Sequence, residues 1–330
     1  MSQLSIGIVG LANVGKSTLF NALLKKQQAL VANYPFATIE PNIGIVPVPD
    51  TRLDKLADVV AKSDGGPSTS LGVSRPPIVP AVVQFVDIAG LVKGASTGAG
   101  LGNKFLANIR EVDLICEVVR DFNDENIIRE GSVSPKDDIE LVKTELDLAD
   151  LQTLEKSKEA KEDLPLLGKK LVLYVYNVSY GESQGSEGAG EIRIDAKVES
   201  ELAGFSEGEQ QELLKEYGLE EPGLNRLIRK AYEMLGLISF LTAPDSAKAA
   251  SGKGWEVRAW TVKMGTKAPQ AAGVIHTDFE KNFIKAEVVS YDDFVANGGW
   301  KKARELGKVR LEGRDYEMRD GDVVEFKVGV

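Results

Sequence analysis

The sequence is poor in the residues that form disulfides and multi-ligand metal sites. It contains one cysteine, Cys116, and one histidine, His276, among 330 residues. A single cysteine excludes an intramolecular disulfide framework and a metal site built from several cysteines. Because disulfides persist mainly in oxidising compartments, we expect a cytoplasmic protein.

The sequence also lacks long apolar segments and an excess of positive charge. It has no run of about 18 or more apolar residues, so we expect no transmembrane helix. The first apolar strand begins so early that we expect no signal peptide. The net charge of −10 argues against binding nucleic acid through bulk charge. From Lys253 to Val330, 14 basic residues balance 13 acidic ones, so this region is the better candidate for contact with RNA.

Residues 10–17, Gly-Leu-Ala-Asn-Val-Gly-Lys-Ser, match the phosphate-binding loop pattern G-x-x-x-x-G-K-[ST] at every fixed position. The apolar run Leu4–Val9 before the loop predicts a buried strand, and Thr18–Leu24 after it predicts a helix. Such a loop points several backbone N–H groups at an anion, next to a helix N-terminus. Lys16 is expected to reach the β- and γ-phosphates, and the Ser17 hydroxyl to ligate Mg²⁺. The predicted nucleotide-binding residues of this segment are Asn13, Val14, Gly15, Lys16, Ser17 and Thr18.

Two further elements distinguish a switch NTPase from other proteins with a phosphate-binding loop. Asp87 and Gly90 form an Asp-x-x-Gly motif directly after an apolar strand. In switch NTPases the Asp reaches Mg²⁺ and the Gly N–H contacts the γ-phosphate. Thr38, in the loop between the first helix and the next strand, is the expected second hydroxyl ligand of Mg²⁺. We therefore predict Lys16, Thr38 and Gly90 as catalytic residues, and Ser17, Thr38 and Asp87 as metal ligands.

The residues that would read the base depart from the guanine-specific pattern Asn-Lys-x-Asp. The predicted strand Leu171–Tyr176 is followed by Asn177, Val178, Ser179 and Tyr180. The Asn is present, but a tyrosine cannot offer guanine the two-oxygen acceptor of a carboxylate. This difference removes guanine discrimination and any penalty against the exocyclic amine of adenine.

The order of the remaining elements predicts an α/β protein with a second, smaller domain. Strands alternate with helices up to about Leu237, which indicates a parallel sheet covered on both faces. A long amphipathic helix opens at Ser134-Pro135 and is as consistent with a solvated surface helix as with a partner-binding arm. From Ile238 onward, short strands and one helix, around Asp292–Ala296, predict a small α+β domain.

At this point the chain resembles a known family, the Obg-like ATPases, also called the YchF family. The resemblance rests on long stretches such as GIVGLANVGKSTLFNAL, NYPFATIEPNIGIVP, FVDIAGLVKGASTGAGLGNKFLANIRE and RAWTVKMGTKAPQAAGVIHTDFEKNFIKAEV. It implies a P-loop NTPase domain of the Obg type over residues 1–238, with a helical coiled-coil insertion at about 131–167. It implies a C-terminal TGS domain, with an α+β β-grasp fold like that of ubiquitin, over residues 239–330.

The resemblance also implies a preference for ATP over GTP, and association with ribosomes in translation or stress responses. Asp195-Ala196-Lys197 looks like the second base-contact loop, so Ala196 joins Asn177 and Val178 as predicted base contacts. In related proteins an Asn at the position of Asn13 helps bind K⁺ near the phosphates, which makes K⁺ a candidate cofactor beside Mg²⁺.

The chain departs from the family pattern at several positions. Tyr180 stands where the family usually has Glu, with Glu182 two residues later. The helical insertion is short, and Glu117 occupies a strand position where bacterial members often have His. Leu91 stands where many switch GTPases place a water-orienting Gln, so we expect slow intrinsic turnover.

The leading hypothesis is a slow, Mg²⁺-dependent ATPase that acts as a nucleotide-controlled switch on the ribosome. We expect a monomer that binds neither membranes nor DNA. One alternative is a GTP-binding regulator. Another is an RNA- or ribosome-binding module that nucleotide merely locks in one conformation.

Overall fold

The computed structural model describes residues 4–33, 42–63, 68–69, 72–73, 75–88, 101–124, 134–156, 166–180, 186–205, 207–245 and 255–329. The chain forms two compact units. The N-terminal unit contains residues 2–47 and 83–235, and the C-terminal unit contains residues 48–82 and 236–330. The predicted boundary at residue 238 lies close to the observed crossing at 235–236. The placement of residues 48–82 in the C-terminal unit does not follow from any local pattern in the sequence.

The N-terminal unit is built on a six-stranded sheet whose order is β2-β6-β1-β7-β8-β9. β1 pairs in parallel with β6 on one side and with β7 on the other, and β7, β8 and β9 continue in parallel. The chain therefore reverses its direction of travel across the sheet at β1, the point where α/β proteins bind ligands at the carboxyl ends of their strands. The strands are β1 (Ser5–Val9), β2 (Ile43–Pro47), β6 (Val82–Asp87), β7 (Leu114–Asp121), β8 (Leu171–Val178) and β9 (Glu191–Ile194).

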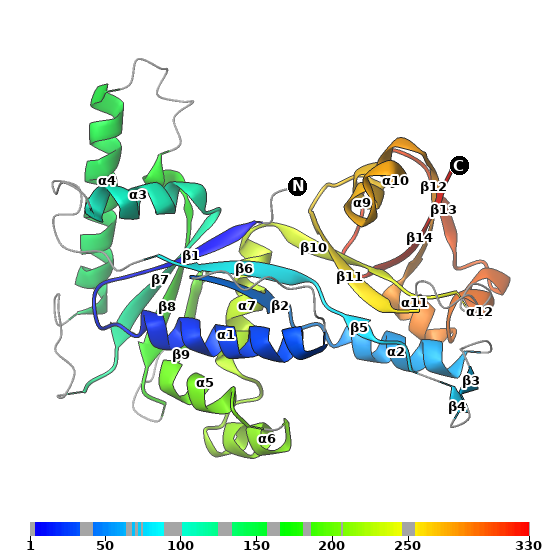
Figure 1. Ribbon diagram of the computed structural model, residues 1–330, viewed down its shortest axis with the longest axis horizontal. Helices are drawn as coiled ribbons and strands as arrows, with labels where there is room; N and C mark the ends of the chain where they lie inside the picture. The colour runs from blue at the N-terminus through cyan, green and yellow to red at the C-terminus, as the bar shows by residue number, and fades with distance from the viewer. Residues whose placement is uncertain are drawn as a thin grey trace. The chain divides into compact units, whose positions relative to one another are not determined.

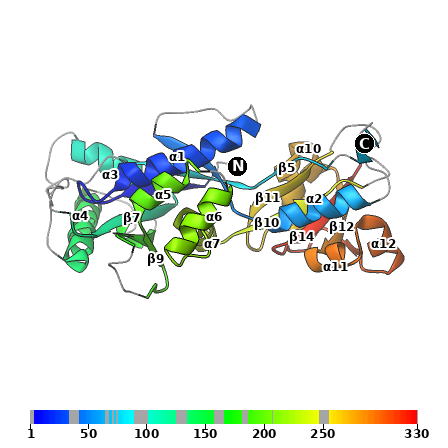
Figure 2. The same ribbon diagram turned by 90° about the horizontal axis from the view of Figure 1, so that it is seen from below.

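Helices follow the strands and cover this sheet (Figures 1 and 2). On one side, Lys25 of α1 donates to the carbonyl of Ser200 in α5, and Lys26 of α1 donates to Asn225 of α7 at 2.7 Å. On the other side α4 packs against β7, the most buried strand. The helices are α1 (Lys16–Asn33), α3 (Leu101–Glu111), α4 (Pro135–Lys156), α5 (Ala196–Leu202), α6 (Glu207–Glu216) and α7 (Gly223–Met234).

The return from α4 to the sheet is closed by one carboxylate. Asp150 accepts from the backbone N–H groups of Leu167 and Gly168, each at 2.9 Å, in the short 3₁₀ helix η1 (Leu167–Lys169). One face of α4 is apolar and buried, and it includes Val142, Leu146 and Ala149. The described part of the insertion is thus one helix fastened to the start of β8.

The C-terminal unit has a mixed six-stranded sheet of order β13-β12-β14-β10-β11-β5. Helix α9 (Ala268–Ile275) packs on one face, where Phe240, Ala271 and Val288 belong to the same apolar cluster. Helix α2 (Arg52–Lys62) packs against β11 through buried residues that include Leu53 and Leu56. The strands are β5 (Ile78–Val79), β10 (Leu237–Thr242), β11 (Val257–Lys263), β12 (Phe283–Ser290), β13 (Arg310–Glu312) and β14 (Asp322–Val328). A separate hairpin pairs β3 (Ser68–Thr69) with β4 (Gly72–Val73).

The prediction of one helix in the C-terminal region was wrong. Besides α11 (Tyr291–Ala296) and α9, the structure has α10 (Thr277–Lys281) and α12 (Trp300–Glu305). The sequence of α9 is rich in alanine and these other helices have five or six residues, so none of them shows a clear helical period of apolar residues. The buried alanines of α9, which include Ala271 and Ala272, allow close packing on the sheet, and the unit has the β-grasp order of two strands, a helix and further strands.

Within the ranges that the structure describes, no helix is long and apolar enough to cross a membrane.

Candidate nucleotide-binding site

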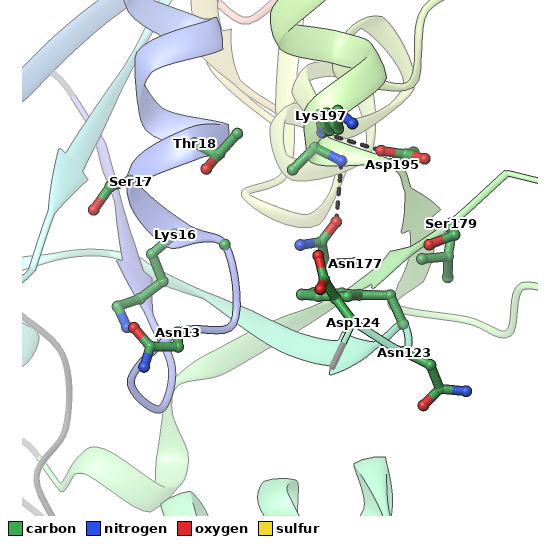
Figure 3. A pocket seen from close by; sticks show the side chains of 14 residues that line it. Asn13, Lys16, Ser17, Thr18, Asn123, Asp124, Asn177, Ser179, Asp195 and Lys197 are labelled. Carbon is green, nitrogen blue, oxygen red and sulfur yellow. Dashed lines mark hydrogen bonds between the residues drawn. The ribbon is translucent and has the colours of Figure 1, made fainter. Parts of the chain in front are cut away.

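A pocket of about 630 Å³ lies at the carboxyl ends of the N-terminal unit's parallel strands. Four segments far apart in the sequence line it: the phosphate-binding loop, the residues after β7, the end of β8 and the start of α5 (Figure 3). The lining residues are Asn13, Gly15, Lys16, Ser17, Thr18, Phe122, Asn123, Asp124, Asn177, Val178, Ser179, Asp195, Ala196 and Lys197.

The phosphate-binding loop connects β1 to α1, and its backbone adopts positive φ angles at several residues. Gly10 and Gly15 have φ angles of 146° and 103°, and Asn13 has φ 59°. A Cβ on Gly15 would lie 2.2 Å from the Nδ2 of Asn177, and one on Gly10 would lie 2.4 Å from the carbonyl oxygen of Val118. Positions 10 and 15 therefore require glycine, both because φ is positive there and because neighbouring atoms leave no room for a Cβ.

Lys16 lies at the first turn of α1, and its ammonium donates to the carbonyl of Leu11. Burial lowers its pKa, and the nearby carboxylate of Asp87 opposes that change. Burial likewise raises the pKa of Asp87, against the influence of Lys16. Asp87 ends β6 and is paired with Ile8 of β1, so the predicted metal ligand and the predicted phosphate ligand meet at one edge of the sheet.

Asn177 joins two of the lining segments through its amide. Its Nδ2 donates to the carbonyl of Val14 at 2.9 Å, and its Oδ1 accepts from the N–H of Ala196 at 3.0 Å. The residue is buried, so these bonds form away from bulk water, where they contribute most. The phosphate-binding loop and the start of α5 are therefore held to the end of β8 by one side chain (Figure 3).

Tyr180 points away from the pocket. Its ring packs against Tyr217 and an apolar cluster of Val198, Leu202 and Leu214. Burial raises the pKa of Tyr180 to about 12, and its buried hydroxyl has no hydrogen-bond partner among the described residues. The tyrosine at the predicted base-reading position thus packs into the protein core.

Residues 122–124 line the pocket but were missed in the sequence. Arg120, buried at the end of β7, donates to the carbonyls of Phe122 and Asp124, and its guanidinium lies 4.4 Å from the centre of the Phe122 ring. A signal was available, because these residues directly follow the strand that neighbours β1. The pattern of residue types offered no motif to match there.

Eight of the predicted site residues line this one pocket: Asn13, Gly15, Lys16, Ser17, Thr18, Asn177, Val178 and Ala196. Val14 contributes its carbonyl, with its side chain buried. Thr38, Gly90, Leu91 and Glu182 lie outside the described residues. Within the described part of the chain, no cluster of three or more His, Cys, Asp or Glu side chains could hold a metal ion.

The chain is similar in structure over nearly its whole length to the solved structure of the Schizosaccharomyces pombe YchF GTPase. The TM-score is 0.78 at 33% sequence identity, and the match covers 98% of each chain. A curated relative named ribosome-binding ATPase YchF, from Bacillus subtilis, is 44% identical over 99% of this chain and 100% of its own length. This chain belongs to the YchF family.

Other comparisons agree with membership of the YchF family. A relative of the same name from Escherichia coli O157:H7 is 43% identical over 98% of this chain and 99% of its own length. A family model described as a 50S ribosome-binding GTPase matches residues 5–170. A model named for the C-terminal part of YchF GTPases, and described as a protein of unknown function, matches residues 237–329.

The Bacillus subtilis alignment extends over 387 positions, 57 more than the 330 residues of this chain. The relative therefore contains stretches for which this chain has no residue.

Glu117, the departure noted in β7, is buried at 4% exposure and stands opposite Val9 of β1 and Tyr174 of β8. Burial, with a further contribution from the carboxyl group of Asp138 in α4, raises the pKa of Glu117 to about 8. The carboxyl group is therefore mostly protonated at neutral pH, unlike the carboxylates at the surface.

Proposed function

We propose that this protein is a slow ATPase that uses ATP to control its binding to the ribosome. The observation that carries the proposal is the convergence of Lys16, Asn177 and Ala196 on one pocket at the carboxyl edge of the parallel sheet. Loop amides, the N-terminus of α1 and the Lys16 ammonium suit a triphosphate. The remaining lining residues leave room beyond the phosphates for a nucleoside.

The polar groups around Asn177 favour adenine over guanine. The N–H of Ala196 already donates to the Oδ1 of Asn177, so a 6-oxo group of guanine would have to compete for that donor. The 6-amino group of adenine is itself a donor and suits the amide oxygen. Tyr180, which replaces the guanine-reading carboxylate, is turned into the core.

Ser17, Thr38 and Asp87 are the proposed Mg²⁺ ligands. Hydroxyl and carboxylate oxygens are the ligands that Mg²⁺ prefers, and Ser17 and Asp87 lie at the same edge of the sheet. When bound, Mg²⁺ supplies positive charge to the β- and γ-phosphate oxygens. Lys16 then orients the phosphates and stabilises the charge that develops on them. Asn13, exposed in the loop, is the proposed K⁺ contact.

The absence of a water-orienting glutamine accounts for the slow turnover. Leu91 occupies that position and has no group that can hydrogen-bond water. Lys16 and Gly90 are left to stabilise charge without a base to place the attacking water. We propose ATPase rates in K⁺ buffer above those in Na⁺ buffer, and equal rates would remove the role of Asn13.

The ribosome is the proposed partner because both cited relatives carry ribosome binding in their names. We propose that the protein acts in the cytoplasm as a monomer, and that the TGS domain contributes to contact with RNA. The proposed domains are residues 1–238 and 239–330, as expected from the sequence.

Two measurements test the proposal. Titration with fluorescent ATP and GTP analogues should give tighter binding of ATP, and tighter binding of GTP would favour the alternative of a GTP-binding regulator. Co-sedimentation with ribosomes should depend on nucleotide and on Lys16→Ala. If ribosome binding changes neither with nucleotide nor with Lys16→Ala, the alternative of a binding module that needs no turnover is favoured.

A further inference from the structure

Asp195 receives an unusual number of backbone hydrogen bonds for a single residue. Its Oδ1 accepts from the N–H groups of Lys197 and Val198 at 3.0 and 3.1 Å, which makes it the N-cap of α5. Its Oδ2 accepts from the N–H of Tyr180 at 3.1 Å. The two oxygens of one carboxylate therefore hold two different segments, the start of α5 and the residues after β8.

The same two segments are also joined by Asn177, through the bond from Ala196. Asp195 and Asn177 thus form two parallel links across the floor of the pocket (Figure 3). Asn177 reaches onward to the phosphate-binding loop at Val14, whereas Asp195 reaches onward to Tyr180, whose ring is fixed in the core. The arrangement connects the pocket to a rigid part of the unit.

We propose that Asp195 is a positioning residue for the nucleotide. By tying Tyr180 to the start of α5, its carboxylate holds Asn177 and Ala196 in the orientation that receives the base. The inference rests on the proposed function of ATP binding. It assigns a role to a carboxylate that lines the pocket but has its oxygens directed at backbone amides.

The physical reason is preorganisation. A site whose loops are already ordered pays less entropy when the ligand binds, so removing a link weakens binding without removing a ligand contact. A lost hydrogen bond to a charged acceptor corresponds to about a tenfold loss of affinity. Chemistry at the γ-phosphate, at the other end of the nucleotide, should be nearly unchanged.

Two substitutions separate the link from the helix cap. Asp195→Ser keeps a side-chain oxygen that caps α5, because serine is a good N-cap, but it loses the second oxygen that reaches Tyr180. Asp195→Asn keeps the length of the side chain but replaces one acceptor with a donor, so either orientation of the amide breaks one of the two connections.

Ser290→Ala is the matched control. Ser290 caps α11 in the C-terminal unit by accepting from the N–H of Asp293 at 3.2 Å. Its loss should lower the melting temperature through a lost helix cap, with no effect on the nucleotide. A change in ATP affinity common to all variants would then indicate general destabilisation.

Three quantities are measured on the full chain: the melting temperature, the Kd and KM for ATP, and amide hydrogen exchange without nucleotide. We expect Asp195→Ser to melt like the wild-type protein, to raise the Kd and KM for ATP about tenfold, and to leave kcat within about twofold. The amides of Tyr180 and Ala196 should exchange about tenfold faster than in the wild-type protein. Asp195→Asn should show the same changes in Kd and exchange.

An unchanged Kd in both Asp195 variants, with the wild-type protein binding ATP, would overturn this inference alone. Unchanged exchange at Tyr180 and Ala196 would overturn it as well. A wild-type protein that does not bind ATP would overturn the proposed function together with the inference. Ser290→Ala weakening ATP binding as much as Asp195→Ser would also count against the positioning role.

Discussion

Two groups of carboxylates, one in each unit, have contrasting partners. In the N-terminal unit, Asp150, Asp195 and Glu199 each accept from two or more backbone N–H groups that begin a helix or a turn. In the C-terminal unit, Asp245, Glu287 and Glu325 surround one guanidinium, that of Arg304, at 2.6 to 3.0 Å. One arrangement fixes the backbone, and the other joins partly buried side chains to one another.

The difference indicates where the path of the backbone has to be fixed. A carboxylate that holds backbone amides fixes the path of the chain, and Asp195 does this for the segments that line the pocket. Ion pairs that water still reaches, as at Arg304 with 35% of its side chain exposed, contribute modest stability, since water screens them and ordering long side chains costs entropy. The C-terminal unit depends instead on the apolar clusters of its sheet.

The buried Glu117 should give the largest effect, because it is an acid held away from water. Its pKa is about 8 in the folded protein, against an ordinary value of 4.5. The folded protein therefore binds more protons than the unfolded chain between these values, and stability falls as pH rises through this window. Glu117→Gln cannot ionise, so relative to this variant the wild-type protein should lose up to about 4 kcal/mol between pH 4.5 and 8.

Denaturant unfolding at several pH values measures this difference. Glu140→Gln is the control, because Glu140 is an exposed carboxylate of α4, the helix that packs against β7. If the free energy of unfolding depends on pH in the same way in the wild-type protein and in Glu117→Gln, the burial of Glu117 does not destabilise its charged form. The N-terminal unit would then show less sensitivity to its buried carboxyl groups than we expect.

Gly15→Ala should produce the next largest effect, on nucleotide affinity. The new Cβ would lie 2.2 Å from the Nδ2 of Asn177 and would force a break in the link to Val14, at a backbone φ of 103°. We expect ATP to bind about 100-fold more weakly. Gly218→Ala is the control, because Gly218 has φ 69° with open space around it. Equal ATP affinities for the two variants would show that backbone strain alone explains the loss.

Glu199→Ala compares the units directly. Glu199 is fully buried and accepts from the N–H groups of Gly223 and Leu224, which begin α7. Its removal should lower the free energy of unfolding by about 2–3 kcal/mol, since two buried amides lose their acceptor. Glu287→Ala in the Arg304 cluster should cost less than about 1 kcal/mol. Urea denaturation measures both, and equal costs would contradict the comparison.

Arg304→Lys should have the smallest effect. Lysine keeps the positive charge but not the planar fork that contacts three carboxylates at once. Because the side chain is 35% exposed, we expect a loss of about 0.5–1 kcal/mol, larger at low salt than at high salt. Thermal unfolding at two salt concentrations checks this. A salt-independent loss would indicate that packing on Trp300, rather than charge, is the contribution of Arg304.

The sequence predicted the parts of the fold that rest on local patterns. The phosphate-binding loop, its flanking strand and helix, and the alternation of strands and helices up to α7 follow from spacing and from glycine and lysine positions. The family resemblance, confirmed by the comparisons, supplied the β-grasp fold of the C-terminal unit. Thr38 and Gly90 stay predictions.

The rest depends on contacts between segments distant in sequence. Nothing local to Tyr180 indicates whether its ring enters the pocket or the core, because that depends on Tyr217 and the apolar cluster beside it. The sequence likewise placed Asp195 in the predicted second base-contact loop, but its link to the residues after β8 depends on the position of Tyr180. The packing of α2 in the C-terminal unit is of the same kind.

The bonds from Asp150 to Leu167 and Gly168 have a consequence for how this chain can vary. They pin α4 at Asp150 to the residues that precede β8, so the chain positions on either side of the insertion are held together. Changing the length of chain between two positions that are held together adds little entropy cost, since that cost grows only slowly with length. The strands that position the pocket would then keep their places, whatever the length of the chain inserted between α4 and β8. One carboxylate makes this part of the molecule free to grow or shrink over evolution.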